Sequence, residues 1–233
     1  MSIPTILLLT LLSIVTSLLF FTLLSPTTSK DIILIGDSRT CGMALYVLGF
    51  SWTKSTGSTP NIISDTPKEK FGYSIKVIAE GSASHYTFLN ENTDVSKGVK
   101  KILSSAKPGT KVLLWLGVNF LSSQGTFDYY KKIALQYKNL KFYAISVTGV
   151  VEAIKIYKVK NENVKKFNLD LKKRIQLSKI SNLVYKSILN KENPIHINNK
   201  GAVTTIDKKY SSDGLHYNAA LYRIIFAAMT SGL

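Results

Sequence analysis

The sequence predicts an α/β protein, a three-layer α/β/α sandwich around a mainly parallel sheet, preceded by an N-terminal transmembrane helix. Short apolar runs alternate with segments of helical periodicity, which is typical of parallel strands joined by helices. The first run, at residues 31–35, has the form expected of a strand buried on both faces. The chain also opens with an uncharged apolar stretch that is long enough to cross a bilayer.

This stretch, residues 3–24, holds 22 residues without a charged side chain and would form a helix about 33 Å long. It lacks the basic start of a cleavable secretory signal, so we expect residues 1–29 to be an uncleaved membrane anchor and residues 30–233 to be one domain. If the N-terminal segment were cleaved, the domain would be secreted. The lysines after the apolar stretch favour a cytoplasmic location of the domain. Long domains translocate largely regardless of charge, however, so we expect the domain to lie outside the cytoplasm.

Four apolar runs predict the strands of the sheet. The first is followed directly by Gly36, and the lysines among the others lie mainly where a strand begins. The predicted strands span residues 31–35, 73–79, 111–116 and 141–147.

Segments with apolar residues at helical spacing predict the helices, and right-handed crossovers would place them on both faces of the sheet. The predicted helices span residues 40–48, 95–105, 127–137, 163–175 and 218–229. Residues 52–70 are rich in Ser, Thr, Gly and Pro and are predicted to form a long loop. Residues 187–210 fit a hairpin or an excursion from the sheet, and we assign no element there.

The composition limits the partners. Lys and Arg number 30 against 14 Asp and Glu, a net charge of +16, while 45% of the residues are hydrophobic, so the chain folds and is not a polycationic tail. The charge would draw the protein toward anionic surface polymers, although lysines on solvated helix faces explain it equally well. No nucleic-acid-binding module accompanies the charge, and we expect no nucleic acid partner. The single cysteine, Cys41, excludes an intrachain disulfide and a cysteine-based zinc cluster, and we expect neither a metal nor a cofactor.

Polar residues cluster where the predicted strands end, which is where open parallel sheets bind ligands. Taken singly, each cluster is weak, because a serine at a helix start is commonly an N-cap and a glycine or asparagine is commonly a turn residue. The clusters are GDSR at 36–39, EGS at 80–82, GVN at 117–119 and DGLH at 213–216.

Together these clusters supply the parts of a nucleophilic site. The hydroxyl of Ser38 needs a base to take its proton, and His216 is the best candidate because an imidazole titrates near neutral pH. Asp213 can accept a hydrogen bond from the other imidazole nitrogen, and a tight turn at Gly214 would put both side chains on one side.

The four clusters, in this order, resemble the SGNH hydrolases, also called the GDSL esterase and lipase family, which is named for a Ser, a Gly, an Asn and a His. The resemblance covers residues 31–229 and implies a flavodoxin-like sheet with catalytic Ser38, His216 and Asp213. It also implies an oxyanion hole formed by the backbone N–H groups of Ser38 and Gly81 and the side-chain amide of Asn119.

The sequence departs from this family at two positions and contains other residues that we expect to be structural. Arg39 replaces the leucine of the family motif, and Phe120 stands where many members have an aspartate, so the substrate preference stays open. We expect Asp37 to brace the turn before Ser38. His85 and His196 are expected at surface or structural positions, and Cys41 is expected to be a small buried residue.

We therefore expect a serine esterase that removes or transfers an O-acyl group, most plausibly O-acetyl on a cell-surface glycan, through an acyl-enzyme on Ser38. The same residues serve hydrolysis and transfer, so the sequence does not separate them. A lipid esterase or thioesterase is the alternative enzyme. A catalytically silent member of the fold that binds anionic surface polymers is the alternative of another class.

Overall fold

The computed structural model describes residues 30–54, 59–151, 159–189, 206 and 208–233. The predicted membrane anchor lies outside these ranges, as does most of the unassigned stretch 187–210. Within the described ranges, no helix is both long enough and apolar enough to span a membrane.

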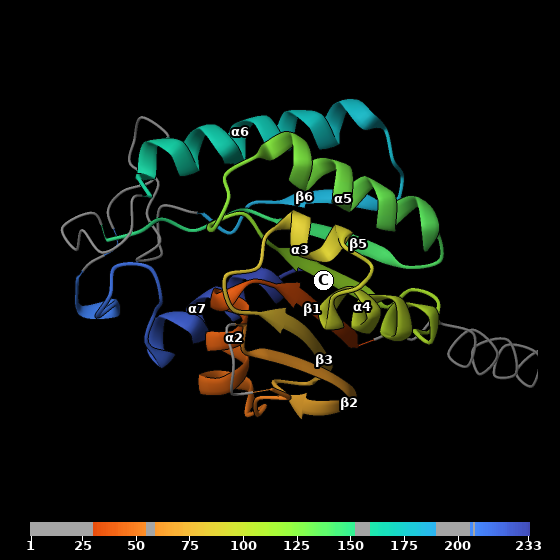
Figure 1. Cartoon of the computed structure of the whole chain (residues 1–233), viewed down its shortest axis with the longest axis horizontal. Coiled ribbons are helices and arrows are strands. Elements are labelled where there is room, and N and C mark those ends of the chain that lie inside the picture. Colours follow the sequence, from red (N-terminus) through yellow and green to blue (C-terminus); the bar gives the residue numbers. More distant parts are fainter. Residues whose placement is uncertain (1–29, 55–58, 152–158, 190–205, 207) are drawn as a thin grey trace, which may run out of the picture.

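The described part of the chain forms one sheet in the order β2-β3-β1-β4-β5-β6, with every strand parallel to its neighbours except β2 at one edge (Figure 1). Without β2, the order is that of a flavodoxin-like sheet, so the predicted mainly parallel sheet is confirmed. The strands are β1 (Asp31–Gly36), β2 (Asn61–Lys70), β3 (Tyr73–Glu80), β4 (Lys111–Trp115), β5 (Lys141–Ile145) and β6 (Leu183–Lys186).

Strand β1 lies at the centre of the sheet, and its residues from Ile32 onward are all buried. Leu34 pairs with Val77 of β3 on one side and with Leu113 of β4 on the other. Burial of both faces explains why this strand reads as a continuous apolar run.

Helices cover both faces of the sheet, and two hydrophobic cores result (Figure 1). One core packs Ile33 and Ile35 of β1 against the helices α3 (His85–Leu89), α4 (Asp94–Ser104), α5 (Ser123–Gln136) and α6 (Asn161–Ser178). The other packs Ile32 and Leu34 against α2 (Ser38–Met43), the π-helical turn η1 (Ala44–Leu48) and α7 (Ala219–Thr230). These layers confirm the predicted α/β/α sandwich.

The predicted loop over residues 52–70 is wrong for its second half, because residues 61–70 form β2. This edge strand pairs antiparallel with β3, Ile62 opposite Ala79, and its register shifts between Ser64 and Lys68, around Pro67. Its last six residues are exposed, so they need not be apolar. Strand β6 and helix α3 were not predicted either, since four and five residues are too few for a periodic signal.

Candidate active site

The turn between β1 and α2 presents Ser38 as the first residue of the helix. Asp37 is the N-cap, and its Oδ1 accepts a hydrogen bond from the backbone N–H of Arg39 at 3.0 Å. Glycine is required at position 36, since a Cβ there would lie 1.9 Å from Thr40 Oγ1 and 2.7 Å from the carbonyl oxygen of Trp115. The turn therefore holds Ser38 at the carboxyl end of the central strand.

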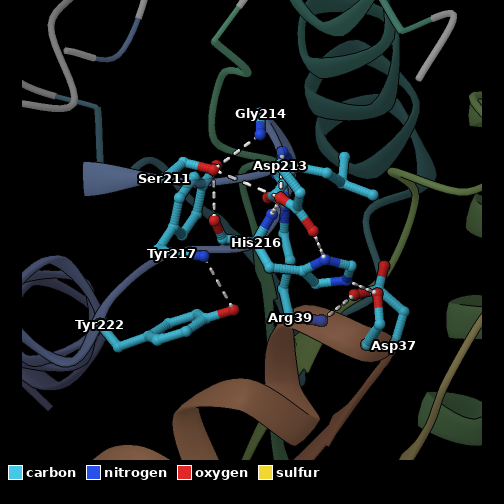
Figure 2. A network of polar contacts seen from close by, with 10 residues as sticks. Asp37, Arg39, Ser211, Asp213, Gly214, His216, Tyr217 and Tyr222 are labelled. Carbon is cyan, nitrogen blue, oxygen red and sulfur yellow. Dashed lines mark hydrogen bonds and ion pairs between the residues drawn. The ribbon is translucent and has the colours of Figure 1, made fainter. Parts of the chain in front are cut away.

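The structure brings Ser38, His216 and Asp213 into one hydrogen-bonded series. The distance from His216 Nε2 to Ser38 Oγ is 2.8 Å, and that from His216 Nδ1 to Asp213 Oδ2 is 2.6 Å. Figure 2 shows the Asp213 carboxylate and the imidazole of His216 pointing toward one another. A base that is itself oriented by a carboxylate thus reaches the serine hydroxyl across 178 positions of sequence.

A tight turn before α7 places Asp213 and His216 on the same side. Oδ1 of Asp213 accepts hydrogen bonds from the backbone N–H groups of Leu215, at 2.8 Å, and His216, at 2.7 Å. Gly214 has a φ of 83°, a conformation that favours glycine, and its N–H donates to Ser211 Oγ at 2.9 Å (Figure 2). These bonds fix the side chains of Asp213 and His216 relative to one short backbone turn.

The environment keeps Asp213 ionised. Burial alone would raise the pKa of this carboxyl, but hydrogen bonds from the His216 ring and from the N–H groups of His216 and Leu215 outweigh it and hold the pKa below its usual value. An ionised Asp213 can accept the Nδ1 proton of His216 and stabilise the imidazolium that forms when Nε2 takes up a proton.

Arg39 forms a buried hydrogen-bond network that the sequence did not indicate. Its side chain is only 1% exposed and does not line the cleft around Ser38. Nε donates to the carbonyl oxygen of Leu215 at 3.0 Å, Nη1 to that of Thr148 at 2.8 Å and Nη2 to that of Gly149 at 3.0 Å. The guanidinium carbon also lies 4.8 Å from the centre of the Tyr217 ring. Arg39 thus ties the helix of Ser38 to the loop after β5 and to the turn that carries His216.

Asp37 braces the turn, as predicted, and is almost fully buried at 2% exposure. Burial raises its pKa to about 6, against the opposing effects of Arg39, His216 and hydrogen bonds from the N–H groups of Arg39 and Val118. The bond from Val118 connects the turn of Ser38 to the turn of Asn119, the next residue in the chain.

The three residues expected to form an oxyanion hole all line the same cleft, but the N–H of Gly81 already forms a hydrogen bond within the protein. The N–H of Gly81 donates to the carbonyl oxygen of Pro60 at 2.9 Å, so it is not free to serve as an oxyanion donor in this arrangement. Asn119 Nδ2 donates one hydrogen to the carbonyl oxygen of Ala83 at 3.0 Å and keeps a second. The N–H of Ser38 lies in the first turn of α2, where helices leave N–H groups without an intrahelical acceptor.

The cleft that contains these groups has a volume of about 810 Å³. Ser38, Gly81, Asn119 and His216 line it together with an aromatic wall, which the sequence analysis did not anticipate. The aromatic residues are Tyr46, Trp52, Tyr210, Tyr217 and Tyr222. Among the described residues, no group of three or more His, Cys, Asp or Glu side chains is placed to hold a metal ion.

The other residues considered in the sequence lie apart from this chemistry. His85 is buried at 2% exposure, not at the surface, and neither ring nitrogen has a hydrogen-bond partner. Burial lowers its pKa, which favours the neutral ring. His196 lies outside the described residues. Cys41 is a buried free cysteine, as expected, and burial raises the pKa of its thiol.

A parallel α/β sandwich with a serine, a histidine and an aspartate in hydrogen-bonded series at its strand ends has the architecture of a triad hydrolase. No family model and no curated protein matches the chain. Among solved structures, it is similar to a candidate platelet activating factor from Streptococcus pneumonia, at 16% identity and a TM-score of 0.56, over 90% of this chain and 86% of that one.

Two further structures are similar to this chain. The acetyl xylan esterase AlAXEase has 15% identity and a TM-score of 0.53, over 87% of this chain and 99% of that chain. A candidate GDSL-like lipase from Parabacteroides merdae has 12% identity and a TM-score of 0.51, over 85% of this chain and 93% of that chain. The chain therefore has the fold of the SGNH, or GDSL, hydrolases, and the resemblance indicated by its four sequence clusters is confirmed at the level of the fold.

Proposed function

We propose that the protein is a carboxylic ester hydrolase that forms an acyl-enzyme on Ser38. The observation that carries this proposal is the hydrogen-bonded series from Ser38 Oγ through the His216 ring to Asp213, with distances of 2.8 Å and 2.6 Å. Such a series supplies a nucleophile, a base and a group that orients the base.

In the first half of the reaction, Ser38 Oγ attacks the ester carbonyl carbon while His216 Nε2 takes the hydroxyl proton. The carbonyl oxygen becomes an oxyanion, toward which the N–H of Ser38 and the remaining amide hydrogen of Asn119 are the available donors. Collapse of the tetrahedral intermediate breaks the bond to the alcohol oxygen, which leaves with the proton from His216. The acyl group stays on Ser38.

In the second half, His216 takes a proton from a water molecule, whose oxygen attacks the acyl carbon. The bond to Ser38 Oγ breaks, His216 returns the proton to Oγ, and the free acid is released. If the hydroxyl of a second molecule replaces water, the acyl group is transferred instead of hydrolysed. The residues involved are the same in both cases.

The proposed substrate is an O-acetyl group on a cell-surface glycan. The similarity to the structure of AlAXEase, an acetyl xylan esterase, supports an acetylated carbohydrate. The net charge of +16 would attract the protein to anionic polymers. We also propose that residues 3–24 anchor the protein in a membrane with the domain outside the cytoplasm.

The test is acetate release by the full-length protein in detergent from a panel of O-acetylated glycans, phospholipids and acyl thioesters. We expect acetate from the glycans and none from the same protein with Ser38→Ala. Turnover of lipids or thioesters alone would contradict the glycan assignment. Activity that survives Ser38→Ala would contradict the acyl-enzyme.

A further inference from the structure

The cleft at Ser38 is much larger than an acetyl group requires. Its volume of about 810 Å³ compares with about 190, 210 and 480 Å³ for three other cavities of the described chain. Volumes of this size are typical of sites that bind a whole small molecule. The cleft therefore has room for the part of the substrate that carries the acyl group.

One wall of this cleft exposes aromatic rings. Tyr46, on η1, is 64% exposed, and Trp52, after α2 and η1, is 38% exposed. Exposed apolar surface that gathers in a concave site marks a place where a ligand binds. In this protein the exposed rings lie in the same cleft as Ser38 and His216.

The Tyr46 ring and the backbone next to Trp52 are held by the fold. The Tyr46 ring stacks on that of Tyr222, with 6.5 Å between the ring centres and 26° between the planes. Gly42 lets Tyr222 approach, since a Cβ at position 42 would lie 2.4 Å from the Tyr222 hydroxyl oxygen. Trp52 precedes Thr53, whose N–H donates to the carbonyl oxygen of Asn61 at 2.9 Å. The aromatic wall is thus anchored to α7 and to β2.

Polar side chains share this cleft with the rings. Ser82 and Ser212 are exposed and line it, as does Asn218, and Lys209 Nζ lies 5.1 Å from the centre of the Tyr210 ring. Flat rings beside hydroxyl, amide and ammonium groups match a sugar, whose C–H faces pack on aromatic rings and whose hydroxyls form hydrogen bonds. A fatty acyl chain would need a continuous apolar surface instead.

We propose that Tyr46 and Trp52 form a carbohydrate-binding subsite on which a sugar ring stacks while its O-acetyl group reaches Ser38. This subsite rests on the proposed esterase function and specifies its substrate. Tyr46 and Trp52 contribute to the binding of the glycan and not to the chemistry at the carbonyl carbon. Their removal therefore raises KM for glycans and leaves kcat for a small ester unchanged.

The first arm of the test compares kinetics of the full-length protein on two kinds of substrate. The glycans are acetylated xylooligosaccharides and O-acetylated chitooligosaccharides, and the small ester is ethyl acetate, which has no ring. For Tyr46→Ala and Trp52→Ala we expect a kcat/KM on the glycans about tenfold lower, a change of about 1.4 kcal/mol, with ethyl acetate turnover within about twofold of wild type. The matched control is Phe71→Ala, because Phe71 is 58% exposed and does not line the cleft.

Equal losses on glycans and ethyl acetate would overturn the subsite, since they would reflect damage to the catalytic residues. No loss on either substrate would overturn it as well. A decanoyl ester is assayed as a third kind of substrate. A loss confined to this ester would assign the rings to an acyl chain and overturn the assignment to sugar.

A second arm separates this proposal from the esterase proposal. Calorimetry on the full chain with Ser38→Ala measures binding of the same oligosaccharides without turnover. If wild type hydrolyses no ester but Ser38→Ala binds oligosaccharides and loses this binding on Trp52→Ala, the esterase function fails and the subsite stands. Absence of oligosaccharide binding by Ser38→Ala would overturn the subsite.

Discussion

Arg39 Nε donates to the carbonyl oxygen of Leu215 at 3.0 Å, which joins the residue after the serine to the residue before the histidine. Three further hydrogen bonds run from this guanidinium to the loop after β5, two to Thr148 and one to Gly149. A buried side chain that touches neither Ser38 Oγ nor His216 Nε2 thus links the segments that carry these two atoms.

We predict that Arg39→Leu lowers the free energy of unfolding by about 3 kcal/mol, because three buried carbonyl oxygens lose a charged donor. We expect kcat on a short-chain ester to fall at least about tenfold with KM little changed, and Arg39→Lys to recover part of kcat. Urea unfolding and steady-state kinetics measure both effects.

The control for this prediction is Arg174→Leu, which removes a half-exposed ion pair with Asp170 and should cost less than about 1 kcal/mol. Full kcat in folded Arg39→Leu would contradict the positioning role.

We predict that His216→Ala lowers kcat on a short-chain ester by about 10³-fold or more, because Ser38 loses its base. His85→Ala is the contrasting variant. It leaves a buried space and should lower the free energy of unfolding by about 2 kcal/mol while kcat stays within about twofold. Comparable losses of kcat in the two variants would show that His216 is not the base.

The oxyanion donors are tested by a pair of variants. Asn119→Ala removes a side-chain amide that lines the cleft and keeps one hydrogen for an oxyanion, and we expect kcat to fall about 100-fold. Gly81→Ala adds a Cβ that would lie 3.4 Å from Pro60 Cγ, an ordinary contact, and leaves the bond to Pro60 in place. We expect its kcat to stay within about threefold. A large loss for Gly81→Ala would indicate that the N–H of Gly81 leaves Pro60 and serves the oxyanion.

The raised pKa of Asp37, about 6, predicts that the free energy of unfolding depends on pH. The folded state holds this proton more tightly than the unfolded chain, so Asp37 favours folding at low pH and loses that contribution as the pH rises through about 6. The free energy of unfolding of Asp37→Asn, relative to wild type, should therefore be higher at pH 7 than at pH 4, by about 2 kcal/mol.

Asp213→Asn is the control, because its effect on the free energy of unfolding should change with pH in the opposite direction. The lowered pKa of Asp213 contributes stability that is present near neutral pH and is lost on acidification. This variant should be less stable than wild type at pH 7, and the difference should shrink only as the pH falls below the ordinary aspartate pKa of 3.8, by urea unfolding. An offset for Asp37→Asn that does not change with pH would contradict the titration of Asp37.

The parallel core of the fold could be predicted because its strands are buried on both faces and their apolar runs are visible in the sequence. Strand β2 could not, since an exposed edge strand can be built from lysines, glutamates and a proline. Its pairing with β3 has a consequence at the site, because it brings the carbonyl oxygen of Pro60 to the N–H of Gly81. A backbone bond of this kind has no sequence signature.

The serine could be predicted because it directly follows a buried strand, and the histidine and aspartate because a nucleophilic serine needs a base and a group that orients the base. The role of Arg39 could not, since its partners are backbone carbonyl groups at positions 148, 149 and 215, which any residue type could supply. Only its place beside Ser38 marked it as unusual.

The most direct test is labelling of the full-length protein with a fluorophosphonate, which reacts with an activated serine hydroxyl, followed by mass spectrometry of the labelled peptide. We predict that one equivalent attaches to Ser38 and that Ser38→Ala and His216→Ala are not labelled. Equal labelling of wild type and Ser38→Ala, or no labelling of a wild-type protein that still hydrolyses esters, would contradict a nucleophilic Ser38.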